Sequence, residues 1–207
     1  MRKAMLLAVF IFGCAQLAPA QDDERKVEFF AGYSYLNTDL DEPDAPLDRF
    51  DNLDGFNVAA TGYITKRFGL TGDFSAYFRN QTEAIPGGTI RFRSRSFNYL
   101  GGPQIRFPNH TRVTPFVHAL AGASNNRFAY RATATGATAP AVDVSVSVTD
   151  FALALGGGLD LRVNRRVAVR LFQVEYYPVF LRDRPELNTN GSRRVDNVRF
   201  SIGLVFK

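Results

Sequence analysis

Histidine is the side chain best suited to acid–base chemistry near neutral pH, and this chain has only two, His110 and His118. A catalytic histidine needs a nucleophile and an orienting group at compatible positions. No nucleophile, base and orienting group stand at such spacing in the sequence. We therefore expect no catalytic residue, and His118 is interpreted below from the strand that contains it.

Metal binding is a second chemistry to consider, because residues 37–54, "NTDLDEPDAPLDRFDNLD", are rich in acidic side chains. Calcium prefers several oxygen ligands, which such a stretch could supply. The glycine and ligand spacing of a calcium-binding loop is missing, however. We expect a solvated acidic loop, with no bound metal and no cofactor.

Arginine is the third chemically informative residue, because its planar guanidinium group binds phosphate through forked hydrogen bonds. Arginines gather near the ends of neighbouring strand candidates described below. A solvated rim of charge is the alternative interpretation. The residues we consider candidate phosphate contacts are Arg91, Arg93, Arg95, Arg193 and Arg194.

The N-terminus indicates export. Residues 1–20 have a basic start, an apolar stretch and the sequence Ala18-Pro19-Ala20 before Gln21, which is the layout of a cleaved secretory signal peptide. The apolar stretch is too short to span a bilayer. A lipoprotein acylated at Cys14 is the alternative. We expect a signal peptide over 1–20 and one mature domain over 21–207, without the chain's single cysteine. No long basic tract suggests a nucleic-acid partner.

Alternation of apolar and polar residues runs through nearly all of the mature chain, whereas helical periodicity is almost absent. The pattern predicts eight strands, over 27–36, 55–65, 68–79, 93–107, 113–124, 149–162, 167–178 and about 194–206. Alternate connections are short, at 66–67, 108–112 and 163–166. The others are long, at 37–54, 80–92, 125–148 and 179–193. We expect "AVDVSVSV" at 141–148 to extend the sixth strand, and "RATATGATAP" at 131–140 to be mobile.

Sorting of short turns and long loops onto alternate connections is typical of an antiparallel transmembrane β-barrel, with periplasmic turns on one rim and extracellular loops on the other. The strands also carry large apolar residues on one face and glycine, alanine and charged residues on the other. This favours lipid around a narrow interior. A soluble eight-stranded barrel is the alternative. In an outer membrane, phosphate bound by the arginines would be that of lipopolysaccharide.

The inward parity of the strands places charged side chains in a lumen just wide enough for side chains to fill. We expect these charges to pair and to block the bore. One strand departs from strict alternation, and we predict a bulge near Leu171 and Phe172 that turns Arg170, Gln173 and Glu175 inward. The predicted lumen network comprises Glu28, Asp73, Arg106, Asp160, Arg162, Arg170 and Glu175.

The chain resembles the outer membrane protein A-like family of bacterial eight-stranded barrels. The resemblance rests on "FFAGYSYL" at 29–36, on "VTPFVHALAGAS" at 113–124, on "VAVRLFQVEYYP" at 167–178 and on the alternating C-terminus. In this family the last strand is the signal read by the outer-membrane assembly machinery. That signal corresponds here to Phe200, Ile202, Leu204 and Phe206, followed by Lys207 where the family usually ends on phenylalanine.

The resemblance implies a monomeric outer membrane barrel with a structural or surface-binding role, in contact with membrane lipids, lipopolysaccharide and an extracellular ligand. A narrow channel for small solutes is the second hypothesis. A lipid A-modifying enzyme is the third, because some barrels of this membrane are lipid A deacylases. A deacylase-like site would place a serine two residues beyond His118, but that residue is Leu120. We interpret His118 as a lumen or aromatic-belt residue.

Overall fold

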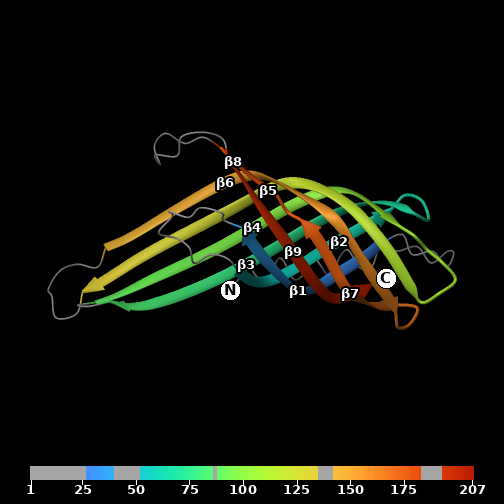
Figure 1. Ribbon diagram of the computed structural model, residues 1–207. Helices are drawn as coiled ribbons and strands as arrows, with labels where there is room; N and C mark the ends of the chain where they lie inside the picture. The colour runs from blue at the N-terminus through green and yellow to red at the C-terminus, as the bar shows by residue number, and fades with distance from the viewer. Residues whose placement is uncertain (1–26, 40–51, 86–87, 135–141, 183–192) are drawn as a thin grey trace, which may run out of the picture.

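One antiparallel β-sheet that closes on itself forms the fold (Figure 1). The computed structural model describes residues 27–39, 52–85, 88–134, 142–182 and 193–207. No helix in these ranges is long and apolar enough to cross a membrane. The strands are β1 (Val27–Asp39), β2 (Asn52–Tyr63), β3 (Phe68–Ile85), β4 (Gly88–Arg106), β5 (Val113–Ala134), β6 (Val142–Arg162), β7 (Val167–Tyr176), β8 (Val179–Leu181) and β9 (Arg193–Phe206).

The seventh strand of the barrel is interrupted and consists of β7 and β8. The nine labelled strands therefore form an eight-stranded barrel. Both β7 and the short β8 pair with β6 on one side and with β9 on the other. Pro178 lies between them and has no backbone N–H to donate to a ladder. The predicted eight-stranded antiparallel barrel is therefore confirmed.

Closure of the barrel depends on β9, which pairs with β7 and with β1. Its register against β1 runs from Phe206, opposite Phe29, to Asp196, opposite Asp39. Each unpaired backbone group would cost several kcal/mol in lipid, so a sheet without free edges is what a membrane requires.

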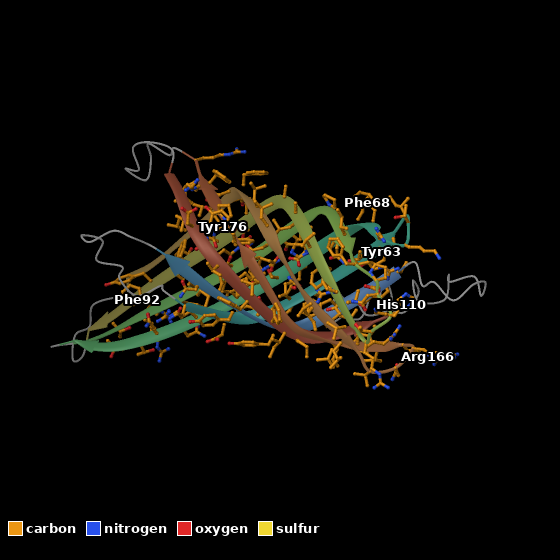
Figure 2. All side chains as sticks on the ribbon, turned by 45° about the vertical axis from the view of Figure 1, so that its right-hand side comes forward. Tyr63, Phe68, Phe92, His110, Arg166 and Tyr176 are labelled. Atoms are coloured by element: carbon orange, nitrogen blue, oxygen red, sulfur yellow. The ribbon has the colours of Figure 1, made fainter. Side chains whose placement is uncertain are left out.

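The two ends of the barrel differ. At one end, here the turn end, residues 64–67, 107–112 and 163–166 connect the strands. At the other, the extended end, β3 to β6 continue well past the other strands, as the left of Figure 1 shows. Figure 2 places Phe68, His110 and Arg166 towards the turn end and Phe92 towards the extended end.

The extension corrects the prediction of long loops at 80–92 and 125–148. Strand β3 reaches Ile85, β4 begins at Gly88, and β5 reaches Ala134. Outward positions here carry arginine, serine and threonine, whereas Phe92 and Val146 lie on the opposite face, so alternation continues with its apolar face reversed. The predicted extension of the sixth strand is confirmed from Val142 onward. Residues 135–141 lie outside the described ranges.

Large apolar residues cover the outer face of the barrel. On β4 the outward apolar stretch runs from Phe97 to Ile105, and on β6 from Phe151 to Leu161. These lengths suit transmembrane strands, which need about 9–11 residues. Most inward positions carry glycine, alanine or polar residues, which fit a narrow interior.

Some inward positions require glycine because the backbone of a neighbouring strand lies close to them. A Cβ atom on Gly156 would lie 2.1 Å from the Val174 carbonyl oxygen and 2.8 Å from Cγ of Glu175. We therefore expect Gly156→Ala to destabilise the barrel by about 1–3 kcal/mol, because the backbone must shift. Urea titration of the protein folded in detergent measures the change. Gly62→Ala is the matched control, because a Cβ there meets nothing within 4 Å. Equal stability of both variants would contradict the proposed crowding at Gly156.

Candidate functional site

A buried ion cluster centred on Arg199 crosses the middle of the barrel interior. Its guanidinium group donates from Nε and Nη2 to the two carboxylate oxygens of Glu175, both at 2.5 Å. Nη1 donates to Oδ1 of Asp73 at 2.9 Å. Arg199 and Glu175 are fully buried, and Asp73 nearly so. One cation thus holds carboxylates from two other strands, in the forked geometry that arginine favours.

The cluster continues to β5 through Glu175. Nε2 of His118 lies 2.8 Å from Oε1 of Glu175, and Gln173 donates to Oε2 at 2.8 Å. Asp73, His118, Glu175 and Arg199 come from β3, β5, β7 and β9. Contacts between side chains from alternate strands therefore span the bore.

A second ion pair lies nearer the turn end. Arg170 donates to both carboxylate oxygens of Asp160, at 2.8 and 3.1 Å, and to Gln173 at 2.6 Å. Its guanidinium carbon lies 4.4 Å from the ring centre of Phe30 and 4.0 Å from that of Phe116. The charge is therefore paired and held between aromatic faces.

Glu28 anchors a third group at the turn end itself. Its carboxylate accepts from Arg106 at 2.8 Å and from Tyr63 at 3.2 Å, and Nζ of Lys207 lies 3.2 Å away. Lys207 therefore pairs with an interior carboxylate. The role of the last strand in assembly remains a prediction, and its predicted residues Phe200, Ile202, Leu204 and Phe206 face outward and are exposed.

An apolar cluster lies in the interior between the ion cluster and the extended end. It packs buried aliphatic side chains against two buried tyrosines. Its members are Leu36, Leu53, Tyr77, Leu100, Leu120, Ala152, Ala154, Tyr177 and Val179. Beside it, buried polar side chains are hydrogen-bonded from Arg199 through Ser75 and Asn98 to Ser96.

Six residues of the predicted lumen network lie in the interior, and Arg162 does not. Arg162 is the last residue of β6, is exposed, and donates to the Thr111 carbonyl oxygen in the neighbouring turn. Its predicted interior position is wrong because the turn captures its side chain at the rim. The predicted bulge is confirmed, because the β7–β9 register shifts between Arg170 and Gln173.

Arg199, the central cation, is the residue that the predicted network lacks. The signal for it is the alternation of β9, in which Arg199 shares its parity with Ser201 and Gly203 while the large apolar residues occupy the other face. His118, interpreted from the sequence as a lumen or aromatic-belt residue, lies in the interior. The described residues contain no group of three or more His, Cys, Asp or Glu that could hold a metal.

A second cluster of charge lies on the outer face of the extended sheet. Three arginines on β4 and two on β5 are exposed there, and Arg95 pairs with Arg127 and Arg91 with Arg131 across the two strands. We call Arg91, Arg93, Arg95, Arg127 and Arg131 the outer arginine patch. Arg194, on β9, is separate from it and forms an ion pair with Asp196 at 2.9 Å. Arg193 also lies on β9, so neither belongs to the patch.

Comparisons with known proteins agree with this architecture. The family model for the outer membrane protein beta-barrel domain matches residues 5–207. No protein with a curated description matches the sequence.

Similar solved structures include Ail, the attachment invasion locus protein of Yersinia pestis, with 18% identity, coverage of 87% of this chain and 96% of that chain, and a TM-score of 0.46. Neisserial surface protein A has 17% identity, coverage of 87% and 95%, and a TM-score of 0.45. OprG from Pseudomonas aeruginosa has 12% identity, coverage of 90% and 98%, and a TM-score of 0.46.

Proposed function

Because this chain belongs to the outer membrane protein β-barrel domain family and lies in the bacterial outer membrane, we propose that it is a plugged, non-enzymatic barrel that acts through its surface. The observation that carries this proposal is the filled interior. Arg199, Glu175 and Asp73 join across the bore, and the apolar cluster lies beyond them. A solute would have to break buried ion pairs and displace packed apolar side chains to pass.

The positions of the titratable groups support the proposal that the barrel is not an enzyme. Nε2 of His118 contacts Glu175, and its ring packs against Phe116, inside the barrel. Glu175 is fully buried and held by Arg199. These groups serve interior packing, and a membrane lipid cannot reach them from the outer face.

The surface that acts in this proposal is the extended sheet. Four paired strands continue beyond the apolar band and present charged and hydroxyl side chains on their outer face. We propose that this sheet projects from the cell and that the chain binds membrane or extracellular molecules there. We also propose a signal peptide over residues 1–20, assembly through β9, and a monomer, since the sheet closes within one chain.

Orientation can be tested by cysteine labelling, because the mature chain is proposed to lack cysteine. Ser147→Cys lies on the exposed outer face of the extension, whereas Asn164→Cys lies in a short turn. We expect a membrane-impermeant maleimide to label the first variant on intact cells and the second only after lysis. Labelling of Asn164→Cys alone on intact cells would invert the orientation.

A further inference from the structure

An amphipathic depression lies on the outer face where the apolar band meets the outer arginine patch. It is open to the surface and has a volume of about 490 Å³. The lining is aromatic and apolar on one side and polar on the other. It comprises Phe97, Tyr99, Ala123, Asn125, Arg127 and Thr149.

The apolar side of the depression arises from a small residue between two large ones. In the sheet register Ala123 stands directly between Tyr99 on β4 and Phe151 on β6. Tyr99 and Phe151 are exposed on the outer face. The short alanine side chain therefore leaves a furrow between the two aromatic rings. This furrow lies at the edge of the apolar band nearest the extended end.

The polar side holds one arginine in place. Nδ2 of Asn125 donates to Oγ1 of Thr149 at 2.7 Å, and Oδ1 of Asn125 accepts from Nε of Arg127 at 3.3 Å. Arg127 faces Arg95 across the strands, and like charges at such positions repel. No carboxylate among the described residues contacts either guanidinium group. An anion between them would remove this repulsion.

We propose that the depression and the arginine patch bind the lipid A part of one lipopolysaccharide molecule of the same membrane. A phosphate binds between Arg95 and Arg127, and an acyl chain lies in the furrow between Tyr99 and Phe151. A soluble polyanion would use the arginines alone and leave the aromatic furrow empty. This inference rests on the proposed function, because it requires a barrel seated in the outer membrane.

Native mass spectrometry of the folded, full mature chain in neutral detergent tests the proposal, with purified diphosphoryl lipid A as the probe. We expect the wild-type barrel to retain one lipid A molecule. The double variant Arg95→Gln with Arg127→Gln should bind lipid A at least about tenfold more weakly, because each substitution removes a charge-assisted hydrogen bond. Ala123→Leu should also weaken binding, because it fills the furrow. Arg165→Gln with Arg166→Gln, at the turn end, and Ala60→Leu, on the outer face of β2, are the matched controls and should bind normally.

Two further probes identify the source of the anion. Dephosphorylated lipid A should bind weakly, and heparin should fail to compete at equal charge. The inference would be overturned if phosphorylated and dephosphorylated lipid A bound equally, or if the double arginine variant bound lipid A as the wild type does. It would also be overturned if heparin competed with lipid A and Ala123→Leu did not alter that competition. Conductance recorded on the same preparations tests the proposed function separately, because steady currents would overturn that function even if lipid A binds selectively.

Discussion

Replacing Arg199 with methionine is expected to lower the free energy of unfolding of the barrel by about 3–5 kcal/mol. The substitution leaves Glu175 and Asp73 buried without the cation that holds both. A buried charge that loses its partner keeps its full desolvation cost but loses the electrostatic attraction that offset it. Urea titration in neutral detergent, followed by the shift between folded and unfolded bands on unboiled gels, measures the loss.

Two comparisons make this prediction specific. Arg194→Met removes an exposed arginine from the same strand, and we expect little change because water solvates Asp196 after the loss. Adding Asp73→Asn and Glu175→Gln to Arg199→Met should recover most of the stability, because the stranded charges disappear. Failure of this triple variant to recover would mean that Arg199 acts through packing rather than through charge.

Replacing Leu155 with arginine is expected to destabilise the barrel in a phospholipid bilayer by about 2–4 kcal/mol. Leu155 lies on the outer face of β6 within the apolar band, and its side chain is exposed on the isolated barrel. A guanidinium group there must leave water for hydrocarbon. Urea-induced unfolding from liposomes measures the effect.

Ser147→Arg is the control on the same strand and the same face, eight residues nearer the extended end. It lies outside the apolar band and opposite Arg127, so the expected loss is limited to the repulsion of an exposed like-charge pair, about 0.2–1 kcal/mol. If Leu155→Arg were as well tolerated as Ser147→Arg, the outward apolar residues would not face lipid.

The barrel itself was predictable because lipid on one face of each strand and a narrow interior on the other impose a strict alternation. Residues such as Leu153 and Leu155 share a parity throughout the band, and the short turns at 64–67 and 163–166 interrupt it at regular places. The extension of β3 to β6 was only partly predictable. Outside hydrocarbon the outward face can be polar, so Phe92 alternates with Arg91 and Arg93 in the parity opposite to that of the lipid-facing band, and the pattern does not continue that band.

The interior was predictable in composition but only partly in its pairing. Parity placed Glu175, Asp73 and Arg170 inward, and the departure from alternation located the bulge that keeps Arg170 and Glu175 on one face. Which cation meets which carboxylate depends on strand stagger and side-chain reach. Arg199 contacts Asp73, from which it is separated by 126 residues in the sequence, and no local pattern encodes that contact.

Single-channel recording from the purified wild-type protein in planar lipid bilayers tests the central claim, that side chains plug the barrel and its surface carries the function. The interior ion cluster and the apolar cluster predict a flat baseline, without steady conductance steps, under conditions in which a porin control conducts. Stable, voltage-independent steps from the correctly folded monomer would contradict the plugged interior and favour a channel for small solutes.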